Sequence, residues 1–226
     1  MKIALVALPH PQETAAAPPL PLAYVAALLE QQRHIVRIYD LGVGDDHAHI
    51  AMEYLAGGDL KQRIQAGVAE RDAIEWTRQI ASALAKVHSV GVLHRDLKPG
   101  NIMLREDDSI ALIDFGLAKR MRLEQEITGS GEIFGTPYYM SPEQGHAGEV
   151  DARSDLYSLG VIFYEMLTGE KPYRASNAMG IIYQHGHAPI PRLPAALAHH
   201  QPLVDRLLAK RPEDRIQTAD EVAGWL

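Results

Sequence analysis

The sequence of 226 residues contains no cysteine and no long uninterrupted apolar run. Without cysteine, the chain can form neither a disulfide nor a thiolate metal site, and it has no cysteine nucleophile. Its 22 lysines and arginines are outnumbered by 29 aspartates and glutamates, which gives a formal net charge of −7. This balance disfavours a surface built to bind the nucleic acid backbone, so we expect no nucleic acid partner.

The apolar stretches are too short for a membrane-spanning helix. Those at 20–29 and 156–167 are interrupted by polar residues or proline, and the apolar segment at 3–8 is short for a secretory signal. We therefore expect no membrane segment in this chain and a cytoplasmic location. The length fits one compact domain, or one domain plus a fragment, at about 150 residues per domain.

The pattern of apolar residues predicts a small mixed α/β unit followed by a mainly helical part. A strand at 2–8 and a helix ending near Gln32 precede two strands, at 35–41 and 47–55, around a turn with Gly42, Gly44 and Asp45. After Asp59, a repeat of mostly apolar residues over 74–87 lies on one face of a long helix that ends near Gly91. Beyond it we expect strands at 102–104 and 110–113, and helices at 154–167, 175–185, 202–209 and 218–226.

Two short strings carry catalytic chemistry. Residues 94–101 read HRDLKPGN, and DFG follows at 114–116, eighteen residues after Asp96. Phosphoryl transfer depends on position and electrostatics: it needs a carboxylate that orients the attacking hydroxyl, and metal ions that neutralise phosphate charge. Asp96 is suited to the first task, while Asn101 and Asp114 offer hard oxygen ligands for Mg²⁺. Lys98 adds a positive charge beside them.

The segment from about Ile35 to the C-terminus resembles the bacterial Ser/Thr protein kinases of the eukaryotic-like family. Besides the two catalytic strings, the resemblance rests on AMEYLAGGDL (51–60), GTPYYMSPEQ (135–144), SDLYSLGVIFYEMLTGEKPY (154–173) and RPEDR (211–215), in that order. It implies an α+β, protein-kinase-like two-lobe fold, with a small truncated β-rich N-lobe at 1–55 and a large, mainly helical C-lobe at 56–226. It also implies a Ser/Thr protein kinase that uses ATP and Mg²⁺ and phosphorylates hydroxyls of protein substrates, including its own loop.

The resemblance assigns catalytic roles to four residues. Asp96 would be the base that receives the hydroxyl proton, Lys98 would contact the transferred phosphate, and Asn101 and Asp114 would hold Mg²⁺.

Five residues would bind the nucleotide by the same resemblance. They are Met52 behind the adenine, the backbone of Glu53 and Leu55 along the adenine edge, Asp59 at the ribose and Met103 on the pocket floor. For the two methionines, plain core packing is the alternative interpretation.

Other matching residues are regulatory or structural. Thr128 and Ser130 are candidate phosphorylation sites, with Arg95 as the cation that a phosphorylated loop would recruit; solvated loop hydroxyls are the alternative. The structural residues are Thr136 against the catalytic loop, a buried Glu143–Arg215 ion pair, and Asp155 bracing the catalytic-loop backbone.

Two histidine pairs and one glycine pair receive no functional assignment. His185/His187 and His199/His200 have metal-ligand spacing, but they lie in proline-flanked stretches without a carboxylate partner, so we interpret them as solvated. Gly42 and Gly44 fit a tight turn rather than a phosphate loop.

The N-terminal segment departs from the kinase pattern. The sequence contains no Gly-rich phosphate loop, and alignment of residues 2–8 with the lysine-bearing strand of kinases puts Ala4 on the alanine and Val6 on the lysine. The acid that pairs with that lysine would fall near Ala23 or Tyr24. A catalytically impaired, pseudokinase-like binding module is therefore the alternative function.

Residues 1–40 also resemble the opening strand, proline loop, helix and second strand of a cobalamin-binding Rossmann-like domain. A third alternative, a cobalamin- or nucleotide-binding Rossmann fragment, would use this unit alone. The sequence leaves open whether a natural fusion, a gene fragment or a design joins the two parts.

Overall fold

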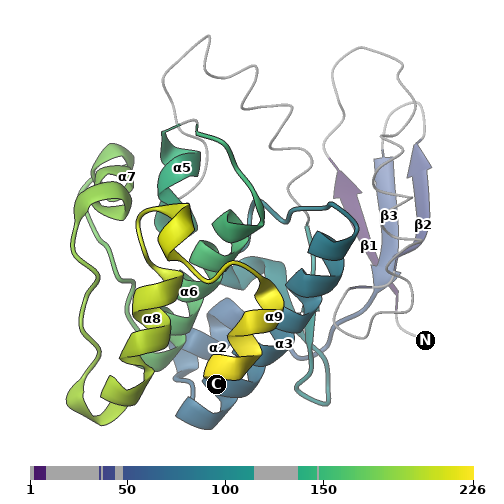
Figure 1. Ribbon diagram of the computed structural model, residues 1–226. Coiled ribbons are helices and arrows are strands. Elements are labelled where there is room, and N and C mark those ends of the chain that lie inside the picture. The colour runs from purple at the N-terminus through teal and green to yellow at the C-terminus, as the bar shows by residue number, and fades with distance from the viewer. Residues whose placement is uncertain (1–2, 9–35, 37, 44–47, 115–136, 147) are drawn as a thin grey trace.

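The computed structural model describes residues 3–8, 36, 38–43, 48–114, 137–146 and 148–226. In this part of the chain, a three-stranded antiparallel sheet stands on one side and a larger group of helices lies on the other (Figure 1). The sheet contains β1 (Ile3–Leu8), β2 (Ile38–Val43) and β3 (Ala48–Glu53), in the order β1-β3-β2. The helix expected before Gln32 lies outside the described residues.

The central strand of the sheet is β3, which pairs with both neighbours. Its register places Met52 opposite Ala4 of β1, and Ile50 opposite Val6. The prediction of Gly42 in a turn is wrong, because the ladder between β2 and β3 continues to Val43 and places Gly42 within β2, opposite His49.

Two long helices form the centre of the helical part. The apolar face of α3 (Glu70–Ser89) is buried, and the helix begins four residues before its predicted apolar repeat, with Glu70 and Asp72 in a first turn that favours negative charge. The second, α6 (Ala152–Thr168), starts at its N-cap Asp151 and ends at Gly169, which adopts a left-handed φ of 72°.

Shorter elements surround these two helices. They are α2 (Leu60–Ala66), β4 (Ile102–Leu104), β5 (Ile110–Leu112), α5 (Pro142–Gly145), α7 (Ala178–His187), α8 (Gln201–Leu207) and α9 (Ala219–Val222), with 3-10 turns η1 (Pro99–Asn101), η2 (Pro137–Tyr139), η3 (Ala195–His200), η4 (Pro212–Asp214) and η5 (Ala223–Trp225). The predicted helices and short strands are thus confirmed to within a few residues. None of the helices in the described ranges has the length and apolar character needed to cross a membrane.

Close packing of α6 against α8 depends on a glycine. A Cβ added to Gly160 would lie 2.6 Å from Cβ of Leu207 and 3.1 Å from Cδ2 of Leu208. Most of α6 is buried, and its apolar residues belong to one continuous core with α3, α8 and α9. Among the residues whose burial the structure describes, the core therefore lies within the helical part.

An ion pair and backbone hydrogen bonds fix the segment after β3 to the helical part. Arg105 donates to the carboxylate of Glu53 at 2.7 and 3.0 Å, and Gly57 N donates to Leu104 O at 2.9 Å. Leu104 N in turn donates to Gly58 O at 2.8 Å. These contacts hold residues 53–58 beside β4, the strand that directly follows the predicted catalytic string at 94–101.

Candidate active site

Asp155 of α6 fixes the backbone of the loop that contains HRD. This buried carboxylate accepts hydrogen bonds from His94 N (Oδ2, 2.9 Å) and Arg95 N (Oδ1, 2.8 Å). Arg95 adopts a φ of 63°, a conformation that costs energy for a residue with a side chain. Asp155 holds that backbone in place, so its predicted bracing role is confirmed.

Three predicted catalytic residues form one hydrogen-bonded group on this loop. Lys98 Nζ donates to Asp96 Oδ2 at 2.7 Å, and Asn101 Nδ2 donates to Asp96 O at 2.9 Å and to Oδ2 at 3.2 Å. The side chains of Asp96 and Lys98 are 24% and 44% exposed, so solvent or a ligand can reach both. Asn101 contacts Asp96 through its amide nitrogen, and its oxygen is not the atom used in these bonds.

A backbone hydrogen bond places Asp114 next to this group. Ile113, which follows β5, donates through its backbone N to Asn101 O at 3.0 Å, so Asp114 comes directly after a residue that is bonded to the catalytic loop. Asp114 is exposed and has a φ of 54°. An exposed carboxylate and a nearby amide oxygen are a donor set that fits Mg²⁺. The other two residues of DFG lie outside the described residues.

The predicted nucleotide-binding residues lie where the sheet joins the helical part. Asp59 and Met103 form an isolated antiparallel bridge, so the expected ribose contact and pocket floor are neighbours. Asp59 also accepts a hydrogen bond from Gln62 N at 2.8 Å and thereby caps α2, a second role besides the expected ribose contact. Leu55 is buried, while Met52 and Glu53 are partly exposed at the end of β3.

His94 of the HRD string is a packing residue. Its side chain is fully buried, and desolvation lowers its pKa below the usual value despite the opposing charges of Asp155 and Asp96. The imidazole is therefore neutral at pH 7.

The family model for the protein kinase domain matches residues 23–224 of this chain. The chain belongs to the protein kinase family. This match confirms the α+β kinase fold and the resemblance on which it was predicted. It starts twelve residues before Ile35, so residues 23–40, part of the segment likened to a cobalamin-binding domain, are kinase sequence.

Curated proteins similar to this kinase domain include three from bacteria. A probable serine/threonine-protein kinase of Clostridium acetobutylicum is 39% identical over 202 aligned positions, and the alignment covers 85% of this chain and 30% of the relative. PknL of Mycobacterium tuberculosis is 37% identical over 197 residues (84% and 49%), and PknB of Mycobacterium leprae is 37% identical over 202 residues (85% and 32%). The chain thus spans half or less of the length of these relatives.

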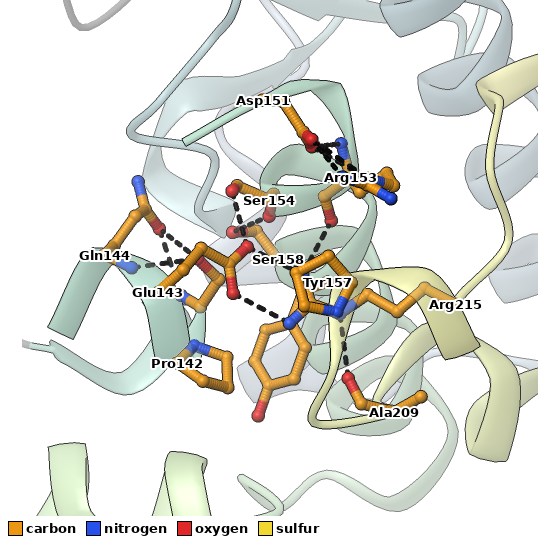
Figure 2. A network of polar contacts seen from close by, with 12 residues as sticks. Pro142, Glu143, Gln144, Asp151, Arg153, Ser154, Tyr157, Ser158, Ala209 and Arg215 are labelled. Carbon is orange, nitrogen blue, oxygen red and sulfur yellow. Dashed lines mark hydrogen bonds and ion pairs between the residues drawn. The ribbon is translucent and has the colours of Figure 1, made fainter. Parts of the chain in front are cut away.

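The kinase domain contains a buried ion pair between α5 and the segment after α8 (Figure 2). Arg215 donates to Glu143 at 2.7 Å (Oε1) and 2.8 Å (Oε2), and its side chain is 0% exposed. Ser154 also donates to Glu143, while Arg215 donates to Ala209 O. Desolvation raises the pKa of Glu143, but the hydrogen bonds from Arg215 and Ser154 and the charge of Arg215 together outweigh it, so the pKa lies below its usual value. The predicted Glu143–Arg215 pair is confirmed.

Two further residues of the kinase domain support the catalytic loop and were missed in the sequence. His88 lies 2.8 Å (Nε2) from Asp155 Oδ2, and Gln144 Nε2 donates to Arg95 O at 2.9 Å. His88 follows Leu84 by four residues, so helical spacing could have placed it on the buried face of α3. No spacing rule connects Gln144 with Arg95, which are 49 residues apart.

The interpretation of the histidine pairs as solvated is wrong for two of the four residues. His185 is 1% exposed and its Nδ1 lies 2.9 Å from the Tyr157 hydroxyl, whereas His200 is 8% exposed and contacts Glu70. Glu70 also contradicts the expected lack of a carboxylate partner. Tertiary packing buries these rings, and loop composition does not reveal it. His187 and His199 are exposed as expected.

The regulatory predictions fall largely outside the described residues. Thr128, Ser130 and Thr136 lie there, and their roles stay predictions.

Proposed function

We propose that this chain is a Ser/Thr protein kinase that transfers the γ-phosphate of ATP to protein hydroxyls, including its own. One observation carries the proposal: Asp96, Lys98 and Asn101 form a single hydrogen-bonded group on a loop that buried Asp155 holds in a strained conformation. The family match and the names of the relatives support the same reaction.

In this proposal, each residue of the site has a separate role. Asp96 orients the substrate hydroxyl and receives its proton, and Lys98 places a positive charge beside the transferred phosphoryl group. Asn101 and Asp114 supply the oxygen ligands for Mg²⁺, which neutralises phosphate charge when bound. Catalysis then comes from position and electrostatics, without a covalent intermediate on the protein.

We also propose that Met52, Glu53, Leu55, Asp59 and Met103 hold the adenosine part of ATP. The contacts that fix residues 53–58 beside β4, and the bridge between Asp59 and Met103, support a shared pocket edge. Residues 1–55 would serve as the N-lobe and residues 56–226 as the C-lobe. The protein would act in the cytoplasm on protein partners, with no nucleic acid partner.

Intact-mass measurement after incubation with Mg²⁺, ATP and a generic Ser/Thr protein substrate tests the proposal. We expect phosphate on the substrate, or on the chain itself, with the wild-type protein and none with Asp96→Asn or Asp114→Asn. Equal transfer by wild-type protein and both variants would contradict the assigned roles. A circular dichroism spectrum of each variant controls for folding.

A second candidate function is favoured by strand β1. The register of β1 puts Val6 opposite Ile50, and residues 3–8 contain no lysine that could anchor nucleotide phosphates. A folded protein that binds nucleotide, or a protein partner, without any transfer would support the impaired binding module instead.

A further inference from the structure

A cluster of metal-ligand side chains lies outside the proposed active site. Within the described part of the chain, Glu70, His199 and His200 present ligand atoms that all lie within 4.8 Å of one another. Glu70 is the first residue of α3, and the histidines end η3. Nε2 of His199 and Nε2 of His200 lie 2.8 and 2.9 Å from the same Glu70 atom, Oε1. Two imidazoles and a carboxylate thus converge from segments about 130 residues apart.

We propose that this cluster binds a divalent transition-metal ion, Zn²⁺ in its preferred form. Imidazole nitrogen and carboxylate oxygen are ordinary Zn²⁺ ligands at about 2.0–2.2 Å, which puts neighbouring ligand atoms of a tetrahedral site roughly 3.4 Å apart. The observed 2.8 and 2.9 Å separations need to widen by only about 0.5 Å. Each imidazole then carries its hydrogen on Nδ1 and presents the lone pair of Nε2 to the ion.

The site has room for a fourth ligand. The side chains of Glu70 and His199 are 42% and 58% exposed, so water can complete the coordination. Three protein ligands and one water is a coordination pattern that Zn²⁺ adopts in proteins.

The most buried ligand is oriented in advance by the core. The side chain of His200 is 9% exposed, and its ring meets Phe163 of α6 edge-on at a centroid distance of 5.5 Å. The His199 ring lies 4.1 Å away. Because the buried ring already points at Glu70, less side-chain freedom is lost when the ion binds.

The proposed site is remote from the catalytic loop. Glu70 precedes His88, the contact of Asp155, by eighteen residues, which is about 27 Å along a helix at 1.5 Å per residue. The ion would therefore join α3 to η3 and stabilise the fold, without taking part in phosphoryl transfer. Mg²⁺ cannot replace it, because imidazole ligands suit Zn²⁺, Cu²⁺ and Ni²⁺ and oxygen-only sets suit Mg²⁺.

Zinc titration and thermal unfolding of the metal-free chain test the proposal. The chain should bind one equivalent of Zn²⁺ at this site. A free Zn²⁺ concentration of a hundred times Kd should raise Tm by about 5 °C or more. Millimolar Mg²⁺ should not reproduce this shift. Glu70→Gln and His199→Gln should each weaken Zn²⁺ affinity at least about 100-fold, since loss of even an outer contact costs about 10- to 100-fold. Both side chains are partly exposed, so these variants should fold.

The matched control is His187→Gln, which removes an exposed histidine stacked on Tyr183 and should leave Zn²⁺ affinity unchanged. The visible absorption of bound Co²⁺ gives a second readout, which should be lost in His199→Gln. The proposal is overturned if Zn²⁺ does not stabilise the wild-type chain, or if affinity is the same in wild type, Glu70→Gln and His199→Gln. It also fails if His187→Gln abolishes binding, because the ion would then sit elsewhere.

Discussion

At the scale of single residues, the catalytic loop depends on one buried carboxylate. Asp155 accepts hydrogen bonds from two consecutive backbone N–H groups and contacts His88 as well. A loop held by a side chain from another helix keeps its shape only as long as that side chain is present. The loop is therefore more sensitive to Asp155 than to its own exposed residues.

We expect Asp155→Ala to lower the free energy of unfolding by about 2–4 kcal/mol, because it leaves buried donors without an acceptor. Phosphate transfer should fall with it, since Arg95 loses the contact that holds its left-handed backbone. Urea unfolding and an initial-rate assay measure the two effects.

Asp151→Ala is the control for this prediction. Asp151 caps the same helix but does not touch the loop, so its loss should cost about 1 kcal/mol and leave transfer unchanged. Similar rates in Asp155→Ala and wild type would show that the loop holds itself.

At the scale of elements, the contact between α6 and α8 is too close for any side chain at Gly160. We expect Gly160→Ala to destabilise the protein by about 1–3 kcal/mol, because its Cβ would lie 2.6 Å from Cβ of Leu207. Thermal unfolding measures the change. Gly224→Ala serves as the control, since a Cβ there meets nothing within 4 Å; equal stability of the two variants would mean that the helices can separate at no cost.

The position of Val6 in strand β1 can be tested by substitution. If Val6 occupies the lysine position of the kinase strand, Val6→Lys should raise nucleotide affinity or transfer rate, because it supplies a positive charge for the phosphates. Nucleotide titration and the transfer assay measure both quantities. Ala7→Lys adds the same charge one position along the strand, and a gain in that variant alone would rule out the alignment.

At the scale of the whole molecule, a buried histidine links stability to pH. Burial and the nearby charge of Lys210 lower the pKa of His185 from 6.5 to about 4. Between these values the unfolded chain binds a proton that the folded chain does not. The free energy of unfolding should therefore be largest above pH 6.5 and fall by up to about 1.4 kcal/mol per pH unit as the pH is lowered toward 4.

His185→Gln removes the imidazole that binds this proton in the unfolded chain. Its urea midpoints at pH 7, 6 and 5 should change less with pH than those of the wild-type protein. The same slope in both proteins would assign the acid sensitivity to other groups, such as His94, whose pKa burial also lowers from 6.5.

Local pattern was enough to predict most elements of the helical part. The buried spacing of Ile80, Leu84 and Val87 on α3 is an example, because helix period and burial act over a few residues. The Glu143–Arg215 pair was predicted from family resemblance, and its partners are 72 residues apart, a distance that no spacing rule spans. The contact of Glu70 with both histidines was missed for that reason: only the packed structure brings α3 and η3 together.

The same Glu143–Arg215 pair has a consequence for the order of synthesis. A ribosome releases the catalytic loop and Glu143 well before Arg215, and a buried carboxylate without its cation is unfavourable by several kcal/mol. The nascent chain therefore cannot lock α5 in place until Arg215 has emerged. A polypeptide whose synthesis stops before this arginine would contain both catalytic strings and still lack an active site with α5 fixed in place.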